Sequence, residues 1–201
     1  MGRVSGYEYD IFISYSRYGS AREWMQNHFL SALKDCLADE IAPTPTIYVD
    51  HTMPRGEDWP SSLQRALLRS KIMVQLLAPH YFQSRWCLAE WHSMRERQKI
   101  LGLASIDVPQ GLICPILYAD SQNFPPEGRN VSWWDFKKFA VPVPAFRKSE
   151  NYVPFYEKVR ELASDLVELL QQAPEWQADW PIIDKPDPVL IPPPKMPRFG
   201  R

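Results

Sequence analysis

DIFISY, at residues 10–15, is a mostly apolar run in which hydrophobic and polar residues do not alternate. A run of this kind is typical of a parallel strand that helices cover on both faces, since neither face then meets water. Three later runs share this character, at Thr46–Asp50, Ile72–Leu77 and Leu112–Tyr118. We therefore predict four strands of a buried parallel sheet. Pro115 lacks a backbone donor, which places the last strand near a sheet edge or at a bulge.

Helical patterns separate these strands. The first starts at Ser20 and Glu23, which have the S-x-x-E spacing of a capping box, and three more run from about 60 to 70, 84 to 99 and 152 to 172. Inward positions of three of these helices recur at helical spacing: Met25, Phe29, Ala32, Leu33, Cys36 and Leu37; Leu63, Ala66 and Leu67; Phe155, Val159, Leu162, Leu166 and Leu169. Strands that alternate with helices predict an α/β fold with a doubly wound parallel sheet. Such sheets bind ligands beyond the carboxyl ends of their strands.

Two stretches depart from the alternation. Residues 120–151 are rich in proline and aromatic residues, and we interpret them as a long connection with one short helix at most. Prolines recur from Pro174 to Arg201, where the chain cannot continue a helix and should follow an extended path. We therefore divide the chain into a domain at 1–173 and a proline-rich tail at 174–201. The tail is either a linker or a segment that packs along the domain.

Bulk composition sets the class of protein. With 45% hydrophobic and 13% aromatic residues, the 201-residue chain can build a core, which argues against disorder throughout. The formal net charge of -1 gives no electrostatic basis for nucleic acid or an anionic membrane as the main partner. The three cysteines lack disulfide or metal spacing, which indicates buried thiols in a reducing compartment. Because the sequence also lacks a signal-peptide core and a bilayer-length apolar run, we expect a cytoplasmic protein.

Three motifs, in chain order, resemble those of the TIR (Toll/interleukin-1 receptor) family. Asp10–Arg17 is similar to its first strand and the loop that follows. Tyr48–Asp50, with Pro54-Arg55-Gly56 and Trp59, is similar to its second strand and BB loop. The SxWCxxE motif at Ser84–Glu90 resembles the helix of the bacterial-type, NAD-cleaving branch. The resemblance covers about residues 7 to 172 and implies a flavodoxin-like sheet of about five strands flanked by helices.

The resemblance marks Glu90 as the catalytic residue. On a helical wheel Trp86 and Glu90 share a face beside the stripe that should pack on the sheet, which comprises Cys87, Trp91, Met94 and Gln98. The Glu90 carboxylate should therefore lie at the border between core and solvent, where a cleft wall would be. An ordinary solvated helix position is the alternative.

The chemistry of NAD⁺ cleavage suits a single carboxylate. Breaking the nicotinamide–ribose bond builds positive charge on the ribose, and a fixed anion nearby stabilises that charge. Nicotinamide leaves as a neutral ring, so a strong general acid is not required.

The resemblance also supplies substrate-binding candidates at both strand-end loops. Ser14, Tyr15 and Arg17 would lie at the carboxyl end of the first strand, near the nucleotide. Arg17 could pair with phosphate oxygens or be a solvated loop residue, and Tyr15 fits the core equally well. Asp50 and Arg55 would shape the BB loop more than contact the ligand.

Two tryptophans and one serine complete the candidate set. Trp59 and Trp86 would wall the nicotinamide end, or else pack in the core. Ser84 would contact the ribose or cap the third helix. The four histidines show no ligand spacing, so we expect no metal.

These resemblances imply an NAD⁺ glycohydrolase that releases nicotinamide with ADP-ribose or a cyclic isomer, with NAD⁺ as substrate and no cofactor. They also imply homo-oligomers through TIR–TIR contacts, a sensor or effector protein as a further partner, and a setting in antiphage defence or immune signalling. A non-catalytic TIR scaffold that signals by homotypic contacts is the main alternative, against which Glu90 and Trp86 argue. A related enzyme that acts on a nucleoside or nucleotide other than NAD⁺ is the third reading.

Overall fold

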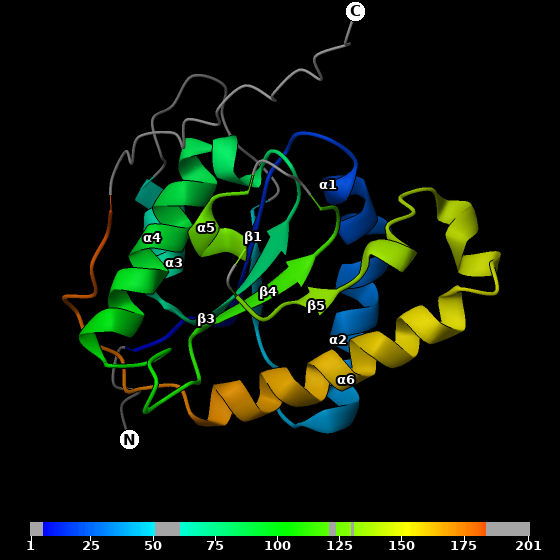
Figure 1. Ribbon diagram of the computed structural model, residues 1–201. Helices are drawn as coiled ribbons and strands as arrows, with labels where there is room; N and C mark the ends of the chain where they lie inside the picture. The colour runs from blue at the N-terminus through cyan, green and yellow to red at the C-terminus, as the bar shows by residue number, and fades with distance from the viewer. Residues whose placement is uncertain (1–5, 51–60, 121–123, 130, 184–201) are drawn as a thin grey trace, which may run out of the picture.

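A five-stranded, all-parallel sheet forms the centre of the protein in the computed structural model, which describes residues 6–50, 61–120, 124–129 and 131–183 (Figure 1). The strands are β1 (Tyr9–Tyr15), β2 (Ile47–Val49), β3 (Ser70–Leu77), β4 (Ile113–Leu117) and β5 (Trp134–Asp135). Their spatial order is β2-β1-β3-β4-β5. This is the flavodoxin-like order, so the predicted fold class is confirmed.

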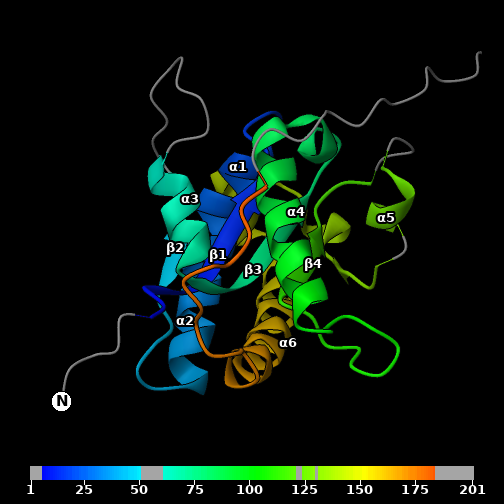
Figure 2. The ribbon, with the colours of Figure 1, turned by 90° about the vertical axis from the view of Figure 1, so that its left-hand side faces the viewer.

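Helices cover both faces of the sheet. They are α1 (Ala21–Trp24), α2 (Leu30–Glu40), α3 (Ser61–Leu68), α4 (Arg85–Ile100), α5 (Pro126–Arg129) and α6 (Tyr152–Gln171). Figure 2 shows α3 and α4 on one face, with α1, α2 and α6 on the other. Among the described residues, no helix combines the length and the apolar character that a membrane span requires.

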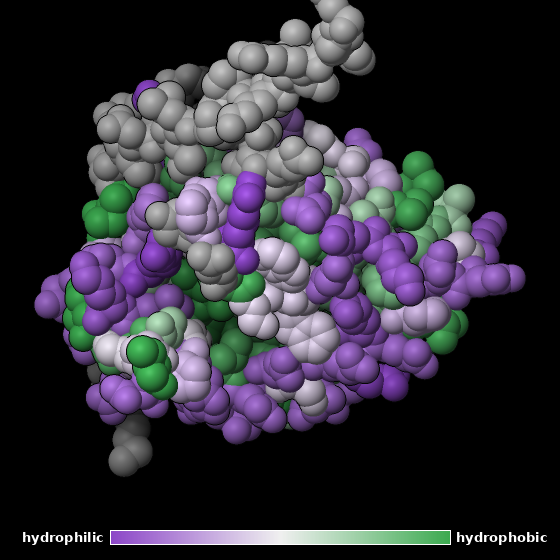
Figure 3. Space-filling model, viewed as in Figure 1, coloured by the Kyte–Doolittle hydropathy of each residue, from purple (hydrophilic) through white to green (hydrophobic). Residues whose placement is uncertain are grey.

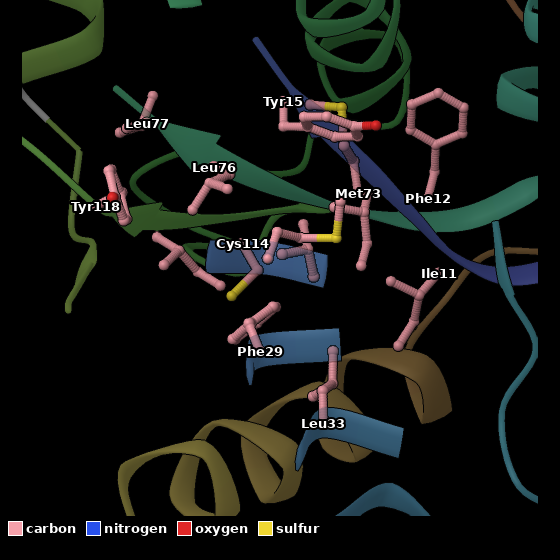
Figure 4. Close-up of a cluster of buried hydrophobic side chains, with 14 of the residues drawn as sticks. Ile11, Phe12, Tyr15, Phe29, Leu33, Met73, Leu76, Leu77, Cys114 and Tyr118 are labelled. Carbon is pink, nitrogen blue, oxygen red and sulfur yellow. The ribbon is translucent and has the colours of Figure 1, made fainter. Parts of the chain in front are cut away.

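The core between the sheet and the α2–α6 layer follows the predicted stripes. Phe29 and Leu33 point from the first helical segment towards Ile11 and Met73 of the sheet (Figure 4). All four side chains are at most 1% exposed. Burying each side chain of this size contributes roughly 1.5–3 kcal/mol. Every predicted inward position is buried apart from Leu169, which is partly buried at the end of α6.

The edge of the sheet contains a strand that the sequence did not predict. Trp134–Asp135 pairs with Ile116 and Leu117 of β4, within the stretch that we interpreted as a long connection. The pairing begins after Pro115, so the proline lies one strand from the sheet edge. The same stretch also contains α5 and two 3-10 helices, Lys137–Phe139 and Pro144–Lys148.

The start of the first helix also differs from prediction. The side chain of Ser20 makes no capping hydrogen bond. Its hydroxyl instead lies 2.8 Å from the hydroxyl of Tyr118, in the chain that follows β4. The predicted capping box is therefore wrong, because a partner distant in sequence takes the Ser20 hydroxyl. A π-helical turn at Met25–Phe29 separates α1 from α2.

Residues 174–183, which we call the strap, run between α3 and α4 on the outside of the molecule (Figure 2). The indole nitrogen of Trp176 donates to the carbonyl oxygen of Leu68 at 3.2 Å, and the amide of Ile183 donates to Ser93 Oγ at 2.8 Å. Trp180 is 4% exposed. This part of the tail therefore packs along the domain. The domain boundary at 173 stays a prediction, and residues 184–201 lie outside the described ranges.

Candidate active site

A pocket of about 380 Å³ lies at the carboxyl ends of β1 and β2, beside the first turns of α4. Its walls include Tyr15 from the end of β1, Asp50 after β2, and Trp86 and Glu90 from α4. The strand order reverses between β1 and β3, because β2 lies on one side of β1 and the later strands lie on the other. Ligands of such folds bind at this switch point. The volume also falls within the about 300–1,000 Å³ typical of small-molecule sites.

Ser84 sets the start of α4 at the pocket. It is the N-cap residue, and its Oγ accepts a hydrogen bond from the backbone amide of Cys87 at 3.4 Å. The capping interpretation of Ser84 is therefore confirmed, although the residue also lines the pocket. The positive end of the helix dipole accordingly faces the ligand space.

Glu90 is more deeply placed than the sequence predicted. Its side chain was expected at the border with solvent, yet the residue is only 6% exposed. Glu90 Oε2 lies 2.5 Å from Ser14 Oγ, which in turn lies 2.7 Å from the hydroxyl of Tyr81. Ser14 has a single proton, so when it donates to an ionised Glu90 it must accept from Tyr81. The two hydroxyls then form a directed chain that ends on the carboxylate.

The environment of Glu90 favours its neutral form in the free protein. Burial raises the pKa of Glu90 to about 8, and the hydrogen bond from Ser14 only partly offsets this. The charge of Asp50 raises the same pKa further, whereas Arg17 lowers it. At pH 7 the neutral acid therefore predominates, and a cation in the pocket would favour ionisation.

An ion pair closes one side of the pocket. Arg17 Nη2 lies 2.6 Å from Asp50 Oδ2, with the Arg17 side chain 34% exposed. The guanidinium carbon of Arg17 is also 6.0 Å from the ring centre of Trp86. The Tyr15 hydroxyl donates to the backbone carbonyl of Asp50 at 2.6 Å. Arg17 therefore joins the loop after β1 both to the end of β2 and to α4.

The structure gathers most of the predicted site residues in one place. Those that line the pocket are Tyr15, Arg17, Asp50, Ser84, Trp86 and Glu90. Ser14 lies behind Glu90, 1% exposed, and contacts the carboxyl rather than the ligand space. Arg55 and Trp59 fall within residues 51–60, outside the described ranges.

Tyr81 contacts Ser14 behind Glu90 but was not among the site residues predicted from the sequence. It is fully buried, and burial raises the pKa of its hydroxyl well above its usual value, so it stays a neutral donor. One signal could have found it. Tyr81 follows β3 by four residues, at the sheet edge where a doubly wound fold binds its ligands.

Cysteine and metal chemistry find little support at this site. Cys87 is 3% exposed, and burial raises the pKa of its thiol far above the usual value, which leaves it unreactive. The three thiols are free and buried, as predicted. Within the described ranges, His, Cys, Asp and Glu side chains form no group of three or more that could hold a metal ion.

Comparison with known sequences identifies the family. A family model described as TIR domain matches residues 11–145, which is more than half of the chain. The chain belongs to the TIR-domain family. No curated protein matches the sequence.

Several solved TIR structures are similar to this TIR domain. That of the Toll-related receptor TRR-2 from the lower metazoan Hydra magnipapillata is 20% identical, with a TM-score of 0.43, over 76% of this chain and 98% of its own. The TIR domains of the activated Roq1 resistosome, which directly recognises the pathogen effector XopQ, are 18% identical, with a TM-score of 0.39, over 82% and 96%. A metazoan TIR-STING receptor from C. gigas, in complex with 2',3'-cGAMP, is 15% identical, with a TM-score of 0.42, over 77% and 40%.

Proposed function

We propose that this TIR domain is an NAD⁺ glycohydrolase, which cleaves the nicotinamide–ribose bond to give nicotinamide and ADP-ribose or a cyclic ADP-ribose isomer. One observation carries the proposal. The Glu90 carboxyl lies in the wall of a pocket at the switch point of the sheet, and two buried hydroxyls hold it in place. A solvated helix glutamate would have neither the pocket nor the fixed orientation.

The reaction moves positive charge across the site. In NAD⁺ the charge resides on the nicotinamide ring, and as the C1′–N bond breaks, the electron pair of that bond neutralises the ring. The ribose then carries the charge as an oxocarbenium-like species. The Glu90 carboxylate stabilises it and accepts a proton from the water that attacks C1′. In the cyclising reaction a nitrogen of the substrate's own adenine takes the place of water.

The raised pKa of Glu90 makes ionisation depend on the substrate. A cationic nicotinamide ring beside Glu90 favours the charged carboxylate, which lowers the pKa of Glu90 below its value of about 8 in the free protein. As the bond breaks, the nicotinamide ring becomes neutral and the ribose becomes cationic. The Glu90 carboxylate then attracts the ribose instead of the ring. Trp86, Arg17 and Asp50 line the pocket. In this proposal Trp86 contacts the nicotinamide end, and Arg17, which pairs with Asp50, lies beside the adjoining phosphates.

Self-association is part of the proposal, because the family resemblance implies TIR–TIR contacts. Asp50 lines the pocket and directly precedes, in the sequence, the segment that is similar to the BB loop. A neighbouring copy that contacts this segment would alter the pocket. We also place the activity in the cytoplasm, in antiphage defence or immune signalling, with a sensor or effector protein as a further partner.

The test is incubation of the concentrated protein with NAD⁺, with nicotinamide and ADP-ribose products measured by mass spectrometry. Glu90→Gln should lower turnover by about 100-fold or more, because the neutral amide cannot stabilise the ribose cation. Glu96→Gln is the matched control, since it removes a more exposed carboxylate from the same helix. Light scattering in parallel measures assembly.

Each outcome separates the competing readings. Ordered assemblies without nicotinamide release support the non-catalytic scaffold instead. Release from another nucleoside or nucleotide, but not from NAD⁺, identifies a different glycosyl-transfer enzyme. Full turnover by Glu90→Gln overturns the assignment of the site even if the reaction is right.

A further inference from the structure

A second, larger hollow of about 1040 Å³ lies on the other side of α4 from the Glu90 pocket. Figure 3 shows the surface recessed here, between α4 and β4, with apolar residues at the floor. Residues of α4 and of the loop at 102–111 line the hollow. The proposed reaction makes no use of this space.

The hollow exists because a short crossover leaves part of the sheet uncovered. Between β4 and β5, on the side of α4, the described chain forms only the four-residue helix α5. Ile113 and Pro115 are therefore half-buried on this face of β4, while Cys114 between them is buried on the opposite face. Both half-buried residues line the hollow. The floor is thus a half-buried apolar strip of the sheet.

The walls of the hollow are fixed. Gln98 Oε1 on α4 accepts hydrogen bonds from the amides of Leu112 at 2.6 Å and Ile113 at 3.1 Å. A Cβ atom at Gly111 would lie 2.5 Å from the same oxygen, so a larger residue there would displace the Gln98 amide from these hydrogen bonds. The cavity is therefore built into the packing of the loop on the helix.

Cationic side chains stand at the rim. Arg95 lies over the ring of Trp91, its guanidinium carbon 4.7 Å from the ring centre. Lys99 pairs with Glu96 at 3.2 Å, but the Lys99 side chain is 77% exposed, so this ion pair is weak. The two cations outnumber the one carboxylate, which favours an anionic group at the rim.

The side-chain amide of Gln75, at the bottom of the hollow, has a donor that makes no hydrogen bond. Gln75 on β3 lines it and is 2% exposed. Its Nε2 faces the Tyr81 hydroxyl closely enough to affect the pKa of Tyr81, yet makes no hydrogen bond of good geometry. A buried donor left in this way is unfavourable, and a ligand that accepts from it would remove the penalty. The terminal torsion of a glutamine rotates over a broad range, so the amide can turn towards a ligand.

We propose that this hollow is a second ligand site, for a small molecule of nucleoside-monophosphate type. Its base would lie on the strip formed by Ile113 and Pro115 and accept a hydrogen bond from the Gln75 amide. Its phosphate would lie between Arg95 and Lys99. The volume and the mixed lining suit a nucleotide better than a free anion, because an anion alone would leave the apolar floor uncovered.

The test measures binding and does not depend on turnover. AMP is titrated into ¹⁵N-labelled protein, and backbone amide shifts are followed by NMR. The expected shifts lie at Leu103, Gly111 and Ile113, whereas AMP in the Glu90 pocket would move Arg17, Tyr18 and Trp86. Adenosine, without the phosphate, and ribose 5-phosphate, without the base, should each bind at least about tenfold more weakly.

Two variants assign the contacts. Arg95→Gln/Lys99→Gln, at exposed positions that should not affect folding, is expected to weaken AMP binding about tenfold or more and to reduce its salt dependence. Gln75→Met is expected to weaken it about fivefold. AMP binding that is unchanged in the double variant, shifts confined to the Glu90 pocket, or no binding at millimolar AMP would each overturn the proposal. NAD⁺ cleavage could persist in all three cases.

Discussion

Helix α4 buries two ionisable side chains, one acidic and one basic, on one face and two turns apart. Glu90 is 6% exposed and Arg97 is 1% exposed. The Arg97 guanidinium donates to the carbonyl oxygens of Ser70 at 2.8 Å and Leu67 at 3.2 Å, and lies 4.9 Å from the ring centre of Trp180. Burial lowers the pKa of Arg97 to about 10, so it stays charged at pH 7, whereas burial raises that of Glu90 to about 8.

The difference between the two residues shows that burial of a charge does not by itself mark a functional site. Arg97 joins α4 to the end of α3 and the start of β3, and the strap covers it. Glu90 has hydroxyl partners on one side and a pocket on the other. A perturbed pKa indicates a functional group where that group borders space for a ligand. Where other side chains surround the group completely, the same perturbation indicates a structural role.

The largest expected effect is the pH dependence of NAD⁺ cleavage. If the Glu90 carboxylate is the active form, kcat/KM should rise about 50-fold between pH 6 and pH 8 and level off above its pKa of about 8. The kcat profile should level at lower pH, because bound cationic nicotinamide lowers the same pKa. Initial rates of nicotinamide release at low and at saturating NAD⁺ measure the two profiles. A kcat/KM that is flat over this range would contradict the assignment.

Substitution of the second charge should affect stability and leave chemistry largely intact. Arg97→Met removes the donors to two buried carbonyls and should lower the free energy of unfolding by about 2 kcal/mol or more. Urea denaturation measures this, with exposed Arg160→Met as the control, expected within about 0.5 kcal/mol of wild type. Glu90→Gln should show the reverse, with lost turnover and no loss of stability at pH 7. If either variant lost turnover and stability together, Glu90 could no longer be assigned to catalysis and Arg97 to stability.

A smaller effect on NAD⁺ cleavage is expected from the hydroxyl of Ser14, which lies between Glu90 and Tyr81. Ser14→Ala removes the hydrogen bond that favours the ionised carboxylate, so the pKa of Glu90 should rise further. We expect kcat/KM at pH 7 to fall about tenfold, with the inflection of the pH profile displaced upward. Ser31→Ala, at an exposed position of α2, is the matched control. An unshifted inflection would mean that Ser14 does not tune Glu90.

The smallest expected effect is at the start of α4. Ser84→Ala removes the N-cap and should lower the free energy of unfolding by about 1 kcal/mol. Ser84→Asp should retain most of this stability, because aspartate also caps helices. Thermal unfolding and NAD⁺ cleavage are measured together. Activity lost in Ser84→Asp despite restored stability would show that Ser84 contacts the ribose as well.

The sheet and its carboxyl-end site could be predicted because the signals are local. Continuous apolar runs identified β1 to β4, and the motif at Ser84–Glu90 placed the carboxylate on the correct helix. A two-residue strand such as Trp134–Asp135 cannot show periodicity, so β5 could not be recognised. It exists only because the edge of β4 offers unpaired backbone groups to it.

What the sequence could not predict depends on contacts between distant residues. Ser20 forms no cap because Tyr118, 98 residues away, takes its hydroxyl. The burial of Glu90 depends on Ser14 and Tyr81, from two other elements, and helical spacing contains no information on either. The pKa of Glu90 follows from that burial and was equally out of reach.

The π-helical turn in the first helix has a consequence for how this segment tolerates change. In a regular α-helix residues five apart point about 140° away from each other. Here Trp24 and Phe29 stack with ring centres 5.2 Å apart, because the wider turn accommodates one additional residue. Deleting the additional residue would leave the two rings four positions apart, and a regular α-helix keeps residues at that spacing on one face. We therefore expect this segment to tolerate the loss of one residue here, because a regular α-helix would direct both aromatic rings into the same core.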